Sequence, residues 1–304
     1  MTQRTVVLRV PPAAQRSLRG RLEGGAFDFR SVPHALFSVK GEGVVATLYR
    51  TGKLVVQGAD PERFTDRFLP GLAPQPTAPR GRSQDPGPEL DGLAMVGSDE
   101  SGKGDYFGPL VVASVRIEAG DGARLREGGV GDSKRLTDET VRRLGPALRE
   151  KFPHAIEAYA PSEYNPLHAE AKNLNTLLAD LHARAIRRVS IPGVRVLIDK
   201  FASDALLKKR LSSLDAVIEQ RPRAEGAMAV AAASIVAREA FLRALDELSE
   251  RFAVNLPKGA GAPVDRALRS FLEIHDYERL GQVAKLHFRN TQKVLGKRGP
   301  GEKP

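Results

Sequence analysis

The chain has 304 residues, 41% of them hydrophobic and 28% charged, which is enough for one large or two modest domains with ordinary cores. It has no cysteine, which excludes disulfides, thiolate metal sites and a cysteine nucleophile and leaves carboxylates and histidines as the expected metal ligands. The formal net charge of +10 indicates a polyanionic partner. No apolar run approaches the ~18 residues of a membrane span and no secretory signal is evident, so we expect a cytoplasmic protein without a membrane partner.

The first 70 residues predict a small basic α+β domain. They carry 11 Lys and Arg residues against 6 Asp and Glu residues, so under a quarter of the chain holds half of the net charge. Short β-branched runs predict antiparallel strands, and two segments that begin with proline predict helices. The predicted strands cover residues 5–10, 35–39, 43–49 and 53–57, and the predicted helices cover residues 12–23 and 61–69. We expect a sheet backed by two helices.

A change of composition separates this domain from the rest of the chain. Between Gly71 and Glu89, proline, glycine and small polar residues replace any hydrophobic period, which is typical of a flexible or extended linker. The predicted organisation is a basic domain over residues 1–70, a linker over 71–90, a second domain over 91–293 and a basic tail over 294–304.

The second domain is predicted to combine strands and helices. Apolar, β-branched runs predict strands, and longer stretches with a helical period predict helices. The predicted strands cover residues 94–98, 110–117 and 194–198, and the predicted helices cover residues 137–152, 174–190, 227–251 and 264–272.

Two of these strands end at acidic residues. Asp99 and Glu100 follow the first strand and lead into the loop Gly102-Lys103-Gly104, and Asp199 follows the strand 194–198. Unpaired buried carboxylates are costly, whereas a divalent cation compensates the charge of several. If the strands lie side by side, the three carboxylates converge at one edge of the sheet. The pattern therefore predicts a site for one or two hard cations.

Six blocks of sequence resemble bacterial ribonuclease HIII, a type-2 ribonuclease H. The resemblance implies an α/β ribonuclease H-like fold, with a mixed sheet flanked by helices, and a small N-terminal α+β domain similar to TATA-binding protein that binds substrate. It also implies endonucleolytic cleavage of the RNA strand of RNA–DNA hybrids with Mg²⁺ or Mn²⁺, which leaves a 5′-phosphate and a 3′-hydroxyl. The blocks are GSDESGKGDYFGP from residue 97, DSKRL from 132, NLNTLLADLHARAI from 173, VLIDKF from 196, AEGAMAVAAASIVAR from 224 and AKLHFRNTQK from 284.

The resemblance assigns Asp99, Glu100 and Asp199 as catalytic metal ligands. In a two-metal site, carboxylates hold ions that activate water and stabilise the leaving oxygen, so that no covalent nucleophile is required.

The fourth acid departs from the family pattern. In the family a glutamate commonly follows the third ligand by four residues, and here that position is Ser203. Asp204, the next residue, is the preferred fourth catalytic acid. Glu239, on the predicted helix 227–251, is the alternative because related enzymes place their last aspartate on that helix. Either acid is also compatible with an ordinary surface position.

Five residues are implied as substrate contacts. The resemblance places the loop of Gly102, Lys103 and Gly104 against the ribose at the cleavage site, where backbone groups reach a 2′-hydroxyl only if no Cβ intervenes. It also implies that Ser133 and Lys134 contact phosphate. A helix cap for the serine and a solvated lysine are the structural alternatives.

Residues near the C-terminus are further candidates for phosphate contacts, namely Lys285, His287, Arg289 and Lys293. Two other functions stay open: incision at single embedded ribonucleotides, as in ribonuclease HII, and binding of RNA–DNA hybrids without catalysis. We expect a monomer that binds RNA–DNA hybrid, and the sequence does not choose between Mg²⁺ and Mn²⁺.

Overall fold

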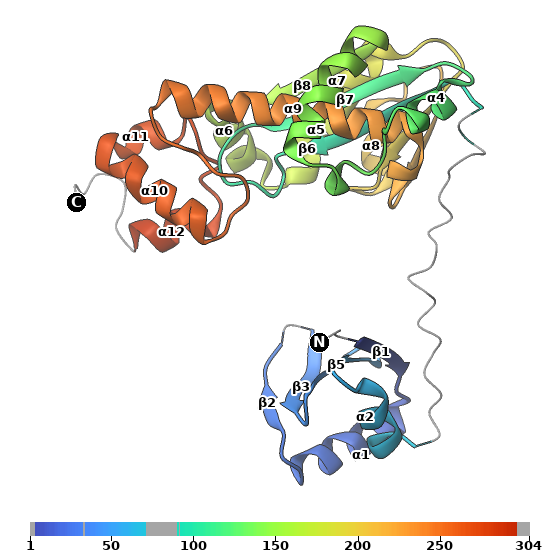
Figure 1. Cartoon of the computed structure of the whole chain (residues 1–304), viewed down its shortest axis with the longest axis vertical. Helices are drawn as coiled ribbons and strands as arrows, with labels where there is room; N and C mark the ends of the chain where they lie inside the picture. The colour runs from blue at the N-terminus through green and yellow to red at the C-terminus, as the bar shows by residue number, and fades with distance from the viewer. Residues whose placement is uncertain (1–3, 33, 71–89, 91, 297–304) are drawn as a thin grey trace. The chain divides into compact units, whose positions relative to one another are not determined.

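The computed structural model describes residues 4–32, 34–70, 90 and 92–296, which belong to two compact units, Met1–Ser83 and Gln84–Pro304 (Figure 1). We call them the small unit and the large unit. Apart from Leu90, the predicted linker lies outside the described residues, as do residues 297–304 of the predicted tail. The first two residues of that tail belong to helix α12 (Arg289–Leu295).

The small unit is a five-stranded antiparallel sheet with two helices. Its strand order is β1-β5-β4-β3-β2. The expected sheet backed by two helices is confirmed, and the sequence analysis missed the edge strand β2. The elements are β1 (Arg4–Arg9), α1 (Pro12–Glu23), β2 (Asp28–Arg30), β3 (Ala35–Gly41), β4 (Val44–Tyr49), β5 (Lys53–Gly58) and α2 (Pro61–Phe68).

Strand alternation gives this sheet two different faces, because successive side chains point to opposite sides. On one face, buried residues such as Leu8 and Leu54 pack in a common core with Leu18 of α1 and Phe64 of α2. The two helices therefore cover this face and leave the other face open.

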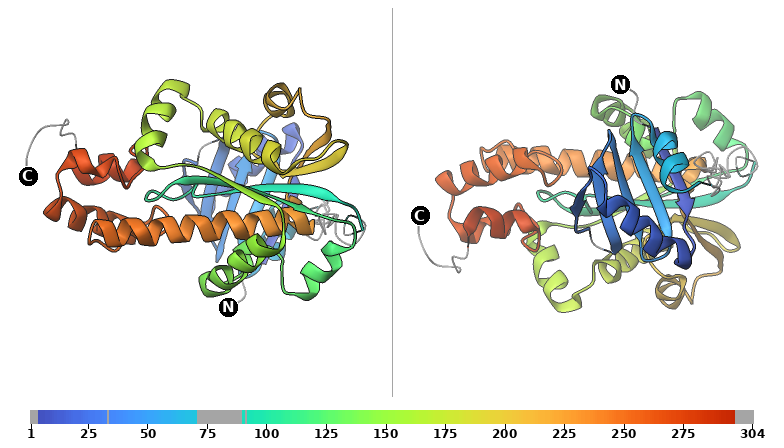
Figure 2. Two further views of the ribbon diagram at one scale, coloured as in Figure 1. Left: turned by 90° about the horizontal axis from the view of Figure 1, so that it is seen from above. Right: turned by 90° about the horizontal axis from the view of Figure 1, so that it is seen from below.

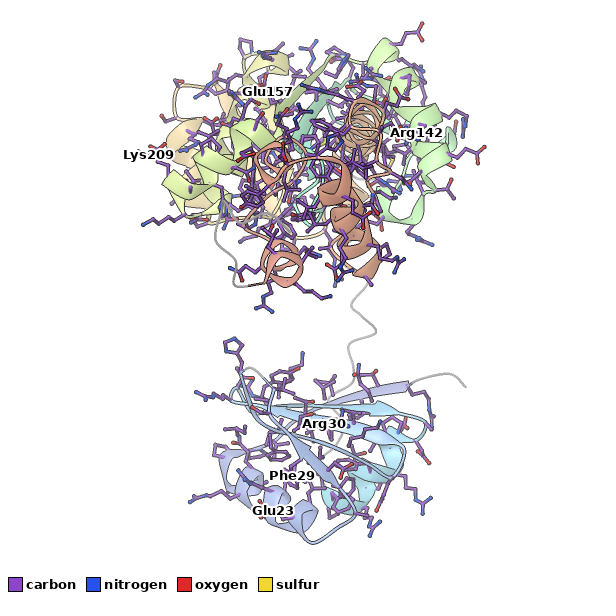
Figure 3. The ribbon with its side chains drawn as sticks, turned by 90° about the vertical axis from the view of Figure 1, so that its left-hand side faces the viewer. Glu23, Phe29, Arg30, Arg142, Glu157 and Lys209 are labelled. Atoms are coloured by element: carbon purple, nitrogen blue, oxygen red, sulfur yellow. The ribbon has the colours of Figure 1, made fainter. Side chains whose placement is uncertain are left out.

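The open face of the small unit carries basic side chains. Arg9 of β1 pairs with Lys53 of β5 across the sheet, and Lys40 of β3 is likewise exposed. Figure 3 shows Phe29 of β2 between the sheet and the helices, whereas Arg30, the next residue, belongs to the open face by alternation. Four basic side chains therefore share this face, together with Asp28 of β2, which pairs with Lys40.

The large unit contains a five-stranded mixed sheet in the order β10-β9-β6-β7-β8. Strands β10, β9 and β6 are parallel, and β7 and β8 continue the sheet in antiparallel pairing. The three central strands are predicted from the sequence, whereas the two edge strands, β8 and β10, are not. The strands are β6 (Met95–Ser101), β7 (Leu110–Ile117), β8 (His154–Tyr159), β9 (Val194–Asp199) and β10 (Ala216–Arg221).

Helices cover both faces of this sheet. Helix α9, with α4 and α5, packs on one face and α7, with α6 and α8, packs on the other (Figure 2). The expected mixed sheet flanked by helices is therefore confirmed. No described helix is long and apolar enough to cross a membrane. The helices are α4 (Asp121–Glu127), α5 (Asp138–Lys151), α6 (Pro161–Ala171), α7 (Leu174–Val189), α8 (Asp204–Arg210), α9 (Met228–Arg251), α10 (Ala262–Ile274) and α11 (Tyr277–Leu280), with the short turns η1 (Ser133–Arg135) and η2 (Ala224–Gly226).

Helix α9 lies unusually close to β6. A Cβ atom at Gly97 would lie 2.1 Å from the backbone carbon of Ala229, so the strand and the helix touch through their backbones. Small side chains make this approach possible, which explains the run of alanines near the start of α9. The close contact holds the middle of β6 against the first turn of the helix.

Candidate active site

The two adjacent acids lie inside strand β6 and not after its end. Because side chains alternate along a strand, Asp99 and Glu100 point to opposite faces of the sheet. Asp99 faces α9, where the hydroxyl of Ser234 donates a hydrogen bond to it. Glu100 faces α7, where it meets His182. The site therefore has two sides, one on each face of the sheet edge.

Asp199 lies beside Asp99 on the α9 side. Strands β6 and β9 are parallel neighbours in which Ser98 pairs with Ile198, so the next residues along the two strands are the two aspartates. Asp199 is the last residue of β9, and its Oδ1 accepts a hydrogen bond from the backbone N–H of Ala224 at 3.1 Å. The fold brings these two predicted residues together.

The neighbouring carboxylates make ionisation of Asp99 unfavourable. Asp99 is 8% exposed, and the backbone N–H of Glu100 donates to its Oδ1 at 2.8 Å. Burial, then repulsion from Glu100 and from Asp199, raises the pKa of Asp99 to about 7, although the hydrogen bonds from Ser234 and Glu100 oppose the rise. A cation at this position would relieve the cost, since opposite charge favours the ionised form.

The two oxygens of Glu100 meet different partners. Oε1 lies 3.3 Å from Nζ of Lys103, and Oε2 lies 3.5 Å from Nε2 of His182. Burial alone would raise the pKa of Glu100, but the contacts with His182 and Lys103 outweigh it and hold that pKa below its ordinary value. Glu100 is therefore favoured as a carboxylate.

Lys134 adds a positive charge to the α9 side. Partial burial lowers its pKa, but attraction to Glu225, Asp99 and Asp199 outweighs burial and raises it. Glu225 lies in η2, and among the described residues its buried Oε2 has no hydrogen-bond partner. Lys134 is therefore attracted to acids from three segments of the site and also to its neighbour Asp132.

Ser133 holds the preceding segment against α9. Its Oγ lies 2.8 Å from Oγ of Ser234, and Arg238 of α9 donates to its carbonyl oxygen. The helix-cap alternative for Ser133 is wrong, since the side chain of Asp132 caps η1 by accepting from the N–H of Lys134 at 3.0 Å. A chain of hydroxyl groups thus connects this segment to Asp99.

The glycine loop follows β6 directly. Gly102 has φ of +86°, and a Cβ atom there would lie 2.1 Å from the carbonyl oxygen of Pro109, so only glycine fits. Gly104 differs, because no atom lies within 4 Å of the position that its Cβ would take. The backbone at Gly104 is therefore open to an approaching ligand.

Lys285 anchors the segment after this loop. It is completely buried, its Nζ donates to the carbonyl oxygens of Gly108 and Pro109, and its backbone N–H donates to the carbonyl of Tyr106 at 2.8 Å. Burial lowers the pKa of Lys285 to about 7. The prediction that Lys285 contacts phosphate is therefore wrong.

The chain also resembles known proteins. Residues 96–291 match the family model described as ribonuclease HII, and residues 5–79 match one described as a domain of unknown function, DUF3378. A ribonuclease HIII of Protochlamydia amoebophila is 38% identical over 282 residues, which cover 91% of this chain and 92% of the relative. The chain belongs to the ribonuclease HIII family. A second family member, ribonuclease HIII of Bacillus licheniformis, is 35% identical and covers 95% of this chain and 96% of its own length.

Solved structures of the family have the same fold. Bst-RNase HIII in complex with Mn²⁺ has a TM-score of 0.64 and 34% identity, and the match covers 96% of this chain and 98% of that chain. RNase H3 of Aquifex aeolicus has a TM-score of 0.53 and 27% identity, with 92% and 98% covered. Ribonuclease H2 of Pyrococcus horikoshii, at 24% identity and a TM-score of 0.57, supports the fold alone.

The structure separates the candidates for the fourth acid of this family member. Glu239 is buried at the contact of α9 with α5, where it lies against Gly145 and pairs with Arg149 at 3.3 Å. The alternative that it completes the metal site is therefore wrong. Asp204 is the first residue of α8, and its side chain lies outside what the structure describes. Glu225, within the AEG block, is an acid that the sequence did not indicate, and it shares with Asp99 and Asp199 an attraction to Lys134.

The side chains present suit a hard divalent cation. The donors are carboxylate oxygens, burial and the neighbouring carboxylates disfavour the ionised form of Asp99, and Oε2 of Glu225 is buried without a hydrogen bond from any described residue. Within the described ranges, no three such side chains already form a cluster that could hold a metal ion. Each carboxylate on β6 and β9 instead accepts from a donor of the protein.

Proposed function

We propose that this chain is a metal-dependent endonuclease that hydrolyses the RNA strand of RNA–DNA hybrids and leaves a 5′-phosphate and a 3′-hydroxyl. The observation that carries the proposal is the parallel register of β6 and β9, which places Asp99 beside Asp199 at the edge of a ribonuclease H-like sheet. Membership of the ribonuclease HIII family supports the same activity. We place its action in the cytoplasm, as a monomer.

We propose Asp99, Glu100 and Asp199 as the residues that hold Mg²⁺ or Mn²⁺, with Glu225 or Asp204 as a fourth acid. Bst-RNase HIII has been solved with Mn²⁺, which supports this choice of ion. When bound, such cations supply Lewis acidity for the attack of water on a phosphodiester. The protein contributes the fixed spacing of β6 and β9 and the charge of the carboxylates.

The groups around these acids suit a nucleic-acid backbone. Lys134 stays protonated, because neighbouring carboxylates raise its pKa, and it is positioned to meet a phosphate once cations offset those carboxylates. Gly104 presents an open backbone that suits contact with a 2′-hydroxyl. The side chain of Lys103 is 41% exposed, so it can break its ion pair with Glu100 and bind a phosphate instead. We assign Gly102 a different task, which is to shape the loop.

The small unit suits a role in holding the hybrid. Its open sheet face carries Arg9, Arg30, Lys40 and Lys53, and residues 1–70 have an excess of five positive charges. Such a surface binds phosphates without reading sequence. We therefore assign it to affinity and not to the chemical step.

The test is to digest an end-labelled RNA–DNA hybrid beside a duplex that contains one ribonucleotide, with Mg²⁺ and Mn²⁺ in turn. Cuts throughout the hybrid and little incision at the lone ribonucleotide are expected. Asp199→Asn is the control and should lose at least ~10²-fold in turnover while still binding hybrid. Preferred incision at the single ribonucleotide would favour the activity of ribonuclease HII, and binding without turnover would leave a hybrid-binding protein.

A further inference from the structure

His182 is a buried histidine behind the acid Glu100. It lies on α7 with no exposed surface, and its Nε2 lies 3.5 Å from Oε2 of Glu100. Both atoms are buried, and among the described residues neither makes a hydrogen bond, so each faces the other at this distance. Because a carboxylate oxygen only accepts, the tautomer with the proton on Nε2 is the one that suits this contact.

The other ring nitrogen is fixed by buried hydroxyl groups. Nδ1 of His182 lies 2.8 Å from Oγ of Ser98, and Ser114 donates to that oxygen at 2.9 Å. The carbonyl oxygen of Ala113, 3.1 Å from the same Oγ, is a second acceptor for the proton of Ser98, and Nδ1 accepts that proton when Nε2 carries its own. Ser98 itself lies two residues before Glu100 on the same face of β6. The ring is thus tied to the strand whose acid it contacts.

The ring of Phe201 restricts the movement of the His182 imidazole further. Phe201, two residues after Asp199, stacks on the imidazole of His182 with ring centroids 4.6 Å apart and planes within 8°. The histidine cannot swing away from Glu100 without losing both the stack and the hydroxyl contact. Its position is therefore set by α7, by β6 and by the segment that follows β9.

We propose that His182 is a positioning residue that fixes Oε2 of Glu100 at its buried end and so leaves Oε1, the oxygen beside Lys103, for a divalent cation. The inference rests on the proposed function, since it concerns a carboxylate of that site. Without this contact the glutamate side chain gains rotamers, and a cation must then bear the entropic cost of ordering it. Partners of this kind typically contribute 10–100-fold to metal affinity or activity.

Two variants separate positioning from packing. In His182→Gln the amide nitrogen reaches the place of Nε2, whereas in His182→Asn it reaches only the place of Nδ1, and both variants lose the ring and its stack. We expect His182→Asn to weaken Mn²⁺ binding by roughly 10–100-fold and to lower kcat, with the KM for hybrid unchanged. His182→Gln should retain Mn²⁺ affinity within about threefold, because it keeps a donor to Glu100.

The measurements are calorimetric titration of the full-length protein with MnCl₂, thermal unfolding, and turnover of an all-RNA/DNA hybrid. His275→Gln is the matched control, since His275 has its Nε2 2.7 Å from the carbonyl of Phe252 and contacts no acid of the site. It should change the melting temperature and leave Mn²⁺ affinity unaltered.

A double-mutant cycle tests whether the effect passes through Glu100. In a Glu100→Gln background, His182→Asn should no longer change Mn²⁺ affinity, because the coupling between the two side chains is already lost. An equal loss in both backgrounds would overturn the proposal, as would equal losses for the Asn and Gln variants or wild-type Mn²⁺ affinity in His182→Asn.

If His182→Asn fails to fold, Phe201→Leu replaces it, since it leaves both ring nitrogens in place and removes only the stack on a half-buried residue. A several-fold loss of Mn²⁺ affinity is expected, and unchanged affinity would overturn the proposal. If the Asn and Gln variants differ in Mn²⁺ binding while the wild type cleaves no hybrid, the proposed function fails and the positioning role stands.

Discussion

Replacing Asp99 with asparagine should stabilise the metal-free protein above neutral pH while it abolishes turnover. Asp99 is 8% exposed and faces the charges of Glu100 and Asp199, and burial together with this repulsion raises its pKa to about 7. Asparagine has nearly the same shape, and its oxygen can take the place of Oδ1 and accept from the backbone N–H of Glu100. The substitution therefore removes a costly charge and keeps this hydrogen bond.

The direction and size of this stability change follow from the linkage between proton binding and folding. The folded-state pKa lies above the ordinary 3.8, so the stability that the protonated group contributes is complete below pH 3.8 and is lost as the pH rises to about 7. The whole difference corresponds to on the order of 4 kcal/mol. Because part of the loss has already occurred at pH 5, the gain from Asp99→Asn should grow by on the order of 2 kcal/mol between pH 5 and pH 8.

The assay is thermal unfolding of the large unit in EDTA at both pH values. A gain of this size means that the Tm difference between Asp99→Asn and the wild type should be roughly 4–8 °C larger at pH 8 than at pH 5. Asp215→Asn, at an exposed position, is the control and should show no such pH dependence. Added Mn²⁺ should stabilise the wild type more than the variant. The reasoning would be refuted if the Tm difference between Asp99→Asn and the wild type were the same at both pH values, or if Asp99→Asn were less stable than the wild type at pH 8.

The fourth acid, the glycine loop and the small unit are each open to a direct test. Glu225→Gln should lower kcat at least ~10-fold on hybrid, whereas Glu239→Gln should lower Tm and preserve kcat, because it breaks a buried ion pair. A wild-type kcat for Glu225→Gln would contradict the assignment of Glu225 as the fourth acid. Asp204 would then be the remaining candidate, and Asp204→Asn would test it. Gly104→Val should preserve Tm and hybrid affinity but lower cleavage at least ~10-fold, as gel mapping of products will show, since a β-branched side chain blocks the open backbone. Deletion of residues 1–70 should raise KM more than it lowers kcat and should weaken the salt dependence of hybrid binding. Equal salt dependence for the full-length and truncated proteins would show that the small unit does not contact the nucleic acid.

The sequence by itself determines the central strands, the main helices and three of the acids. Strands β6, β7 and β9 lie in the centre of the sheet, and each contains or directly follows a short apolar run, AMV for β6, LVVASV for β7 and VLI for β9, that local composition identifies. The edge strands β2, β8 and β10 mix polar and apolar residues, because one side of an edge strand lacks a neighbour. Their sequences, DFR, HAIEAY and AVIEQR, have no pattern strong enough to predict a strand.

Only the tertiary structure decides which side chains meet. Asp99 and Glu100 are neighbours in sequence, yet β6 points them to opposite faces, and the register with β9 then pairs Asp99 with Asp199. His182 and Lys285 look like ordinary polar residues of a helix and a basic C-terminal segment, but segments distant in sequence enclose both completely. Burial and partnership depend on strand register and helix packing, which are long-range, whereas the sequence pattern reports only local preference.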